Sequence, residues 1–115
     1  MKLILAFIRP DRVETVKAAL AEVGISRMTV MNCQGFGREV DRTQRHRGHE
    51  PPADLHRKVQ LQVAVREEAV ERTIDAIVRG GRTDGNGEVG DGKIFVLPLE
   101  QCIRIRTGKR GDEAI

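Results

Sequence analysis

The chain carries two kinds of hydrophobic pattern, one typical of strands and one typical of helices. Residues 2–8 form an apolar run, which is typical of a strand covered on both faces or buried between subunits. Residues 28–33 are rich in β-prone side chains, and apolar residues alternate with others from 59 to 65, which indicates a half-buried strand. A fourth strand is expected over 93–99, where Pro98 indicates a strand end or an edge strand.

Two helices are predicted between these strands. Pro10 and Asp11 mark the start of the first helix, and Gly24 ends it in the left-handed conformation that suits glycine. Residues 67–68 are both glutamate and open the second helix, where negative charge suits the helix dipole, and residues 80–81, both glycine, end it. Apolar residues three or four positions apart form one stripe on each helix: Val13, Val16, Leu20 and Val23 on the first, and Val70, Ile74, Ile77 and Val78 on the second.

The order of these elements predicts an α+β fold. Two β-α-β units joined by a long segment give the ferredoxin-like βαββαβ sandwich, in which both helices cover one face of a four-stranded antiparallel sheet. With 115 residues, the chain is expected to form a single domain over 1–115. The other face of the sheet then needs cover, and a homotrimer with the sheets at its centre would supply it.

The long central segment, residues 38–56, shows no hydrophobic periodicity. It contains charged residues, two adjacent prolines and all three histidines of the chain, and a connection of this length is usually functional or disordered. Imidazole and carboxylate groups together suit divalent transition metals, so His46, His49 and His56 are candidate metal ligands. Their spacing is not that of a compact metal site, and a polar solvated loop is the alternative.

Composition and charge exclude several classes of protein. The net charge of +3 comes from 20 basic and 17 acidic residues, far from the dense positive charge of a nucleic-acid-binding protein. We see neither an apolar stretch long enough to cross a bilayer nor a secretion signal, so we expect a cytoplasmic protein without direct membrane insertion. Cys33 and Cys102 are isolated and suggest neither a zinc site nor a disulfide framework.

Three short stretches are candidates for binding chemistry. The Gly-rich loop over 82–92 would let backbone N–H groups approach a phosphate, and Lys93 adds a charge, although a flexible connection is the alternative. In the C-terminal segment, 101–115, Arg104 and Arg106 would point to the same side of an extended chain and grip one polyphosphate, unless they belong to a solvated basic tail. Small residues over 35–38 would let a ligand pack against the backbone, or form a simple turn.

Taken together, these motifs resemble the PII nitrogen-regulatory signal-transduction family along nearly the whole chain. The resemblance implies a homotrimer that binds ATP or ADP in the clefts between subunits and regulates a target membrane transporter or enzyme, without being an enzyme itself. The matching stretches are Met28–Val30, Gly35–Arg38, Arg47–Gly48, Lys58–Val59, Gly90–Val96 and Ile103–Gly108.

The resemblance also assigns roles to individual residues. The loop ending in Gly90, Asp91, Gly92 and Lys93 would hold the phosphates through backbone N–H groups and the Lys93 ammonium, and Arg104 and Arg106 would reach them from the neighbouring subunit. Thr29, Gly35, Phe36, Gly37 and Arg38 would form the wall around the adenosine and the entry to the phosphates. Lys58 would pair with the distal carboxylate of 2-oxoglutarate, and residues 38–56 would be the T-loop, which docks onto target proteins and changes shape with the ligand bound.

Two residues of the T-loop depart from the family pattern. Glu39 stands where the family has a glutamine that coordinates Mg²⁺ between ATP and 2-oxoglutarate. A carboxylate also binds Mg²⁺, but it adds repulsion of about 1 kcal/mol in water, and more in a dry cleft, beside a dianion. We therefore expect a weak or absent response to 2-oxoglutarate. Pro51 stands where many bacterial members carry a tyrosine, which excludes uridylylation at that position.

Two other functions remain open. In one, the chain is a metal-responsive binding protein that uses the histidines of the loop and is linked to metal efflux. In the other, it is a phosphotransferase or an ATPase, which is disfavoured because no pair of catalytic groups stands out in the sequence.

Overall fold

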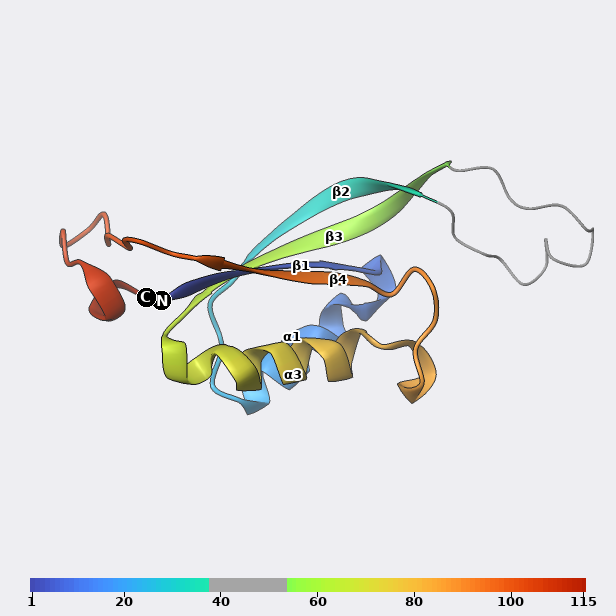
Figure 1. The fold of residues 1–115 in the computed structure, drawn as a ribbon, viewed down its shortest axis with the longest axis horizontal. Helices are drawn as coiled ribbons and strands as arrows, with labels where there is room; N and C mark the ends of the chain where they lie inside the picture. The colour runs from blue at the N-terminus through green and yellow to red at the C-terminus, as the bar shows by residue number, and fades with distance from the viewer. Residues whose placement is uncertain (38–53) are drawn as a thin grey trace, which may run out of the picture.

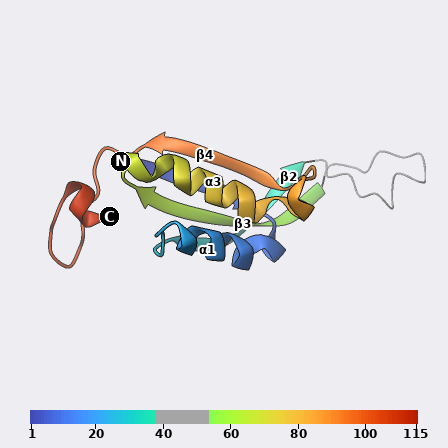
Figure 2. The same cartoon turned by 90° about the horizontal axis from the view of Figure 1, so that it is seen from below.

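The predicted fold is confirmed by a computed structural model, which describes residues 1–37 and 54–115. A four-stranded sheet has the strand order β2-β3-β1-β4, and each neighbouring pair is antiparallel. Helices α1 and α3 lie side by side on one face of this sheet, as the views in Figure 1 and Figure 2 agree. The elements are β1 (Lys2–Ile8), α1 (Val13–Glu22), β2 (Thr29–Gly37), β3 (Asp54–Val65), α3 (Val70–Gly81) and β4 (Gly92–Pro98).

The core lies between the sheet and the two helices. Alternate residues of β1 and β3 point toward the helices and are buried, and both predicted helix stripes contribute to the same cluster, except for Val78, which is exposed. Because burial of apolar surface is the main favourable term in folding, this cluster determines which face of the sheet the helices cover. Its largest fully buried apolar side chains are Ile4, Val16, Leu20, Leu61, Val63, Val65 and Ile77.

The helices begin and end close to the positions predicted from the sequence. Gly24 has φ of 83°, and the amides of Gly24 and Ile25 donate to the carbonyls of Ala21 and Leu20 at 3.1 and 2.9 Å. This pair of bonds is the Schellman motif, which confirms the predicted glycine cap. Residues 10–12 and 67–69 form 3₁₀ turns, so each α-helix begins slightly later than the predicted start.

The prediction that the long loop extends to His56 is wrong at its C-terminal end. Strand β3 begins at Asp54, and β2 continues to Gly37, so that the two strands form a ribbon that extends past the end of β1. The Nε2 atom of His56 lies 3.2 Å from the carbonyl oxygen of Gly37. Neither helix covers this ribbon, and without a buried face it lacks the apolar alternation that predicts a strand.

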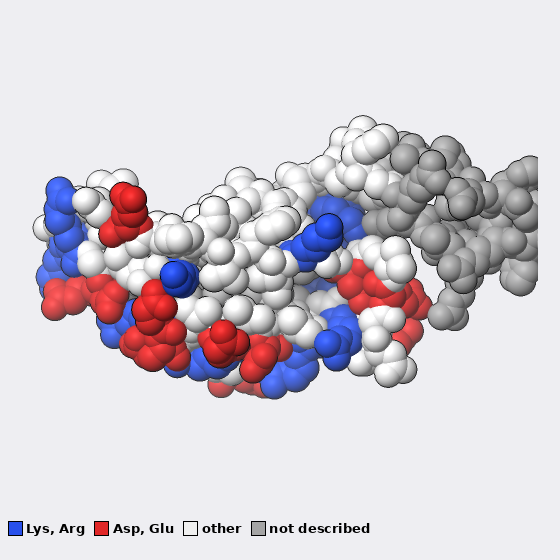
Figure 3. Space-filling model, viewed as in Figure 1, with Lys and Arg blue, Asp and Glu red and all other residues white. Residues whose placement is uncertain are grey.

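The second face of the sheet carries no helix in the described part of the chain. By the strand register, Leu3, Leu5 and Phe7 of β1 point to this open face together with Phe95 and Leu97 of β4. Phe95 and Leu97 are 49% and 39% exposed. In Figure 3 the surface over the sheet is largely uncharged, whereas charged side chains follow the helix side. Within residues 1–37 and 54–115, the fold therefore leaves an apolar sheet face without cover, as the sequence predicted.

Within residues 1–37 and 54–115, neither helix is long and apolar enough to cross a membrane.

Gly80 provides a first test of the fold, because α3 crosses α1 closely at this residue. A Cβ atom at Gly80 would lie 2.7 Å from the Cα atom of Val16 and 2.9 Å from the carbonyl oxygen of Thr15. We expect Gly80→Ala to lower the free energy of unfolding by about 1–3 kcal/mol through this overlap, despite the gain in helix propensity. Urea unfolding followed by circular dichroism measures the change, since the chain has no Trp or Tyr.

The neighbouring glycine is a matched control. A Cβ atom at Gly81 would meet only side-chain methyl groups, at 3.7 and 3.8 Å, which is ordinary contact. Gly81→Ala should therefore leave stability unchanged or raise it by about 0.5–1 kcal/mol. Equal losses in the two variants would contradict the close crossing at Gly80.

Candidate functional site

The candidate site lies where the end of β1 meets the start of β4. Ile8 pairs with Gly92 in the sheet register, and Gly92 has φ of 112°. A Cβ atom at this position would lie 1.6 Å from the carbonyl oxygen of Phe7. Only glycine fits such an approach of two backbones. The chain therefore enters β4 from the Gly-rich loop in one fixed geometry, and Lys93 follows directly.

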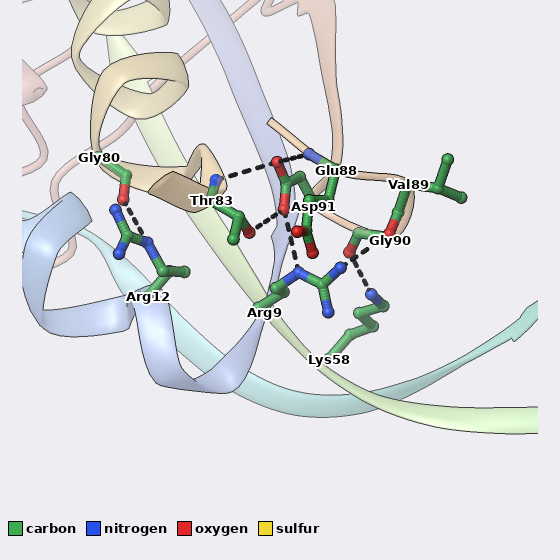
Figure 4. Close-up of polar contacts among 9 residues, drawn as sticks. All are labelled: Arg9, Arg12, Lys58, Gly80, Thr83, Glu88, Val89, Gly90 and Asp91. Atoms are coloured by element: carbon green, nitrogen blue, oxygen red, sulfur yellow. Dashed lines mark hydrogen bonds and ion pairs between the residues drawn. The ribbon is translucent and has the colours of Figure 1, made fainter. Parts of the chain in front are cut away.

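The Gly-rich loop, residues 82–91, is organised around the carboxylate of Asp91. Its Oδ2 atom accepts hydrogen bonds from the amides of Thr83 and Glu88 at 3.0 and 2.8 Å, and its Oδ1 atom accepts one from the Thr83 hydroxyl (Figure 4). The Gly87 amide also donates to the Thr83 carbonyl at 2.8 Å. These bonds link the two ends of the loop. The glycines at 85, 87 and 90 all have positive φ.

Asp91 is held in its charged form. Partial burial would by itself raise the pKa of Asp91, but the hydrogen bonds from Thr83, Glu88 and Arg9 together hold that pKa well below its ordinary value. The carboxylate is therefore ionised at neutral pH. Its acceptor positions point into the loop and toward Arg9, so its part in the site is to shape the backbone.

Two cations tie the loop to the sheet. Arg9, directly after β1, donates from Nε to Oδ1 of Asp91 at 3.0 Å and from Nη2 to the carbonyl of Val89 at 2.7 Å. Lys58, on β3, donates from Nζ to the carbonyl of Gly90 at 2.6 Å. Figure 4 shows both side chains reaching the loop from the sheet. The carbonyls of Val89 and Gly90 thus accept hydrogen bonds from Arg9 and Lys58.

Two hollows lie on either side of Lys93. The sheet-side hollow, about 460 Å³, opens on the uncovered sheet face. Phe7 and Phe95 form an apolar wall there, with ring centroids 5.9 Å apart at 76°. The helix-side hollow, about 680 Å³, lies between the Gly-rich loop and α3. Gly92 and Lys93 line both hollows, so Lys93 lies where two concave, partly apolar surfaces meet.

Comparison with known proteins identifies the family of this chain. The family model described as nitrogen regulatory protein P-II matches residues 1–109. The chain belongs to the nitrogen regulatory protein P-II family. P-II proteins are regulators, and the chain is thus a nitrogen-regulatory signal-transduction protein by family, as the resemblance predicted.

P-II proteins of other organisms match this chain over its full length. The chain is 46% identical to the nitrogen regulatory protein P-II of Azospirillum brasilense and 43% identical to that of Microchaete diplosiphon, over 115 residues that cover all of both chains in each case. The crystal structure of Arabidopsis thaliana PII bound to citrate matches with a TM-score of 0.78 and 37% identity, covering 98% of this chain and 87% of that one.

The structure of this P-II chain brings most of the predicted site residues of the loop and sheet together. Six of them line the sheet-side hollow: Gly35, Phe36, Lys58, Gly90, Gly92 and Lys93. Asp91 lines the helix-side hollow instead and turns its carboxylate to Thr83 and Arg9. Gly37 pairs with Asp54, and Thr29 pairs with Gln62 farther along the sheet, so neither of them lines the sheet-side hollow.

The two arginines of the C-terminal segment lie far from Lys93 in the same chain. Strand β4 runs from Gly92 to Pro98, and its seven residues span about 20 Å. Arg104 and Arg106 follow beyond the far end, where the C-terminal segment folds back through a bridge between Ile103 and Arg110. The Nη2 atom of Arg104 donates to the carbonyl of Glu113 at 2.9 Å. One P-II chain therefore does not bring its arginines to its own Lys93.

Several predicted residues lie outside the described part of the chain. These are Arg38, Glu39, His46 and His49, so their predicted roles are untested. Of the three candidate metal ligands, His56 alone is described, and it lies on β3 beside Gly37. Within residues 1–37 and 54–115, there is no group of three metal-ligating side chains.

Sequence reasoning missed Arg9 and Thr83, which hold the Gly-rich loop through Asp91. In the sequence, Arg9 is a charged residue between a predicted strand and Pro10. Its partner, Asp91, lies 82 positions away. The strand order of the structure makes β1 and β4 neighbours, which places the residue after β1 beside the residue before β4. The sequence pattern alone carries no signal for this pairing.

Proposed function

We propose that the chain binds ATP or ADP in the clefts between the subunits of a homotrimer, with Mg²⁺ as an accompanying ion, and controls a target transporter or enzyme through residues 38–56. The observation that carries the proposal is the shape of the loop ahead of Lys93. Backbone loops of this kind suit phosphate groups, and the ammonium of Lys93 adds a charge-assisted hydrogen bond to a phosphate oxygen.

The separation of the basic groups supports a site shared between two chains. Lys93 stands at one end of β4, and Arg104 and Arg106 lie beyond the other end. In an assembly with rotational symmetry, the C-terminal segment of one subunit reaches the loop of the next, and the same contact repeats around the axis. Three copies then form three equivalent sites, each with a lysine from one chain and two arginines from its neighbour.

The uncovered sheet face supports the same assembly. Leu3, Leu5, Phe7, Phe95 and Leu97 point to this face, and large contiguous apolar surfaces on soluble proteins mark interfaces. Ile105, in the C-terminal segment, is 99% exposed. Both features are expected of a subunit whose sheet packs against two others and whose C-terminal segment crosses to a neighbour.

Signalling in this proposal depends on different affinities of the ligands for different shapes of residues 38–56. ATP and ADP differ in the γ-phosphate and its metal, and a ligand shifts a conformational equilibrium only by its differential affinity for the two states. Glu39 places a negative charge near the base of this segment, so we expect a weak or absent response to 2-oxoglutarate. The expected setting is the cytoplasm, with a target protein as partner and no nucleic acid.

Neither alternative function gains support from the described residues. His56 contacts a backbone carbonyl, and the metal-responsive function has no group of three ligands in this part of the chain. An enzyme would need a positioned acid, base or nucleophile. Asp91 does not serve as one, because its carboxylate already accepts bonds from Thr83, Glu88 and Arg9.

Lys93→Ala tests the proposal directly. We expect it to weaken ATP and ADP binding by about 1.5–3 kcal/mol, the range for a hydrogen bond to a charged group. Titration calorimetry with ATP, ADP and AMP, each with and without Mg²⁺ and 2-oxoglutarate, measures the affinity and the number of sites per subunit. Saturable binding at one site per subunit is the expected result for the unmodified chain.

The matched control is Lys17→Ala, which removes the same charge from α1. Lys17 lies 3.4 Å from Glu14 in an exposed ion pair, away from the site. Its removal should leave nucleotide affinity unchanged. If Lys93→Ala binds nucleotide as tightly as Lys17→Ala does, Lys93 has no part in phosphate binding.

A further inference from the structure

We propose that Arg9 is a positioning residue for nucleotide binding: it holds the Gly-rich loop, residues 82–91, in the phosphate-binding shape before any ligand arrives. The inference rests on the proposed function, because it takes this loop as the phosphate site. Arg9 itself lines neither hollow beside Lys93, and its guanidinium is bonded to Asp91 and Val89. Its effect on the ligand is therefore exerted through the loop backbone.

The geometry of Arg9 suits this role. Its guanidinium spans two parts of the loop at once, with Nε 3.0 Å from Oδ1 of Asp91 and Nη2 2.7 Å from the carbonyl of Val89. Its side chain is 25% exposed, and that of Asp91 is 18% exposed, so water competes only partly for this ion pair. Arg9 is anchored in turn by the backbone, because it lies between β1 and the 3₁₀ turn that begins at Pro10.

Arg9 acts on a loop that is rich in glycine. Glycines at 85, 87 and 90 give the free loop many conformations, and fixing them has an entropic cost. If Arg9, through Asp91, fixes them before the ligand binds, this cost does not reduce the binding affinity. Asp91 is the connecting group, since the same carboxylate holds Arg9 and the amides of Thr83 and Glu88.

Arg12, at the end of the 3₁₀ turn that follows Arg9, offers a matched control. Its Nε atom donates to the carbonyl of Gly80 at 3.0 Å, so it binds the end of α3 and not the loop (Figure 4). Arg12→Ala removes the same charge as Arg9→Ala and a hydrogen bond to a carbonyl, but it leaves the ion pair to the loop in place. Any effect of lost positive charge, or of lower global stability, should therefore appear in both variants.

The experiment measures two quantities for Arg9→Ala, Arg9→Lys and Arg12→Ala. The first is hydrogen exchange of the Thr83 and Glu88 amides without nucleotide, followed by NMR. The second is ADP affinity by calorimetry. We expect Arg9→Ala to lose protection at both amides and to bind ADP about tenfold more weakly, the change that one charged hydrogen bond produces. Arg12→Ala should keep both properties.

The conservative variant separates positioning from charge. Arg9→Lys keeps the positive charge, but a single ammonium does not reproduce the two-pronged geometry of a guanidinium. We expect it to lose most of the protection and of the affinity. Guanidinium ion at a non-denaturing concentration should restore both in Arg9→Ala, whereas sodium chloride at equal ionic strength should not. A merely structural contribution to global stability would not respond in this way.

Each result decides the proposal. Full affinity in Arg9→Lys, equal losses in Arg12→Ala, or unchanged protection of Thr83 and Glu88 in Arg9→Ala would each overturn it. If the unmodified chain binds no nucleotide, the proposed function fails. The exchange measurement then still shows whether Arg9 orders the loop, so the two failures are distinguishable.

Discussion

Gly92→Ala is expected to destabilise this protein more than any other single substitution considered for its fold. A Cβ atom at Gly92 would lie 1.6 Å from the carbonyl oxygen of Phe7 and 2.8 Å from its carbonyl carbon, and φ of 112° is unfavourable for any other residue. The obstacle is backbone, which has no rotamer to change, so β1 and β4 must separate. We expect a loss of more than about 4 kcal/mol in the free energy of unfolding.

Urea unfolding followed by circular dichroism measures this loss, at one protein concentration because assembly contributes to apparent stability. Gly85→Ala is the matched control. It also replaces a glycine of positive φ, 77°, but a Cβ atom there meets no atom within 4 Å. Its cost should be limited to the strain of the left-handed conformation, about 1–2 kcal/mol. A Gly92→Ala variant no less stable than Gly85→Ala would show that the strands do not approach as described.

The same residue illustrates what the sequence predicts and what it does not. A glycine before Lys93 was predicted to let a phosphate approach the backbone. In the structure, the close approach at Gly92 is made by the backbone of β1. Both the phosphate and the β1 backbone need a residue without a side chain at this position. The sequence does not tell which of the two approaches the glycine. That neighbour is fixed by the pairing of β1 with β4, which is a long-range property.

Strand and helix positions were predictable where one face of the element is buried. The alternation over 59–65 and the stripes of both helices identify the core, because burial imposes a period on the sequence. The start of β3 at Asp54 was not predictable in this way. That part of the strand pairs only with β2, away from the helices, and hydrogen bonds between backbones impose no pattern on the side chains.

In the candidate site as well, residues indicated by the local sequence were predicted, and residues that depend on long-range contacts were not. Gly90, Gly92 and Lys93 were predicted from a Gly-rich loop with a lysine together with the family resemblance, and the structure places all three along the sheet-side hollow. Arg9 was not predicted, because its role depends on an ion pair with a residue 82 positions away. Asp91 was predicted to contribute its backbone to the phosphate site, and the structure adds a role for its carboxylate, which holds the loop. Residue type indicates what a group is able to bind, and only the topology decides which partner it reaches.

The functional prediction with the largest expected effect concerns Arg104 and Arg106 together. Replacing both with alanine removes two charged groups from the proposed phosphate site, and we expect ATP affinity to fall by about 3–5 kcal/mol. Because these arginines lie about 20 Å or more from Lys93 of the same chain, the loss should arise at the site of the neighbouring subunit. A titration of the double variant alone does not show this, since both arrangements predict the loss.

Mixing subunits separates the two arrangements. When Lys93→Ala chains and Arg104→Ala/Arg106→Ala chains are unfolded together and refolded as mixed assemblies, some clefts combine an intact lysine with intact arginines. Random assortment at equal amounts gives about a quarter of such clefts in a symmetric ring. Calorimetry should then recover tight ATP binding at about that fraction of sites, although neither parent binds tightly. Each parent refolded alone is the control. No recovered sites in confirmed mixed assemblies would show that the lysine and arginines do not act across a subunit boundary, and the proposed nucleotide site would be wrong.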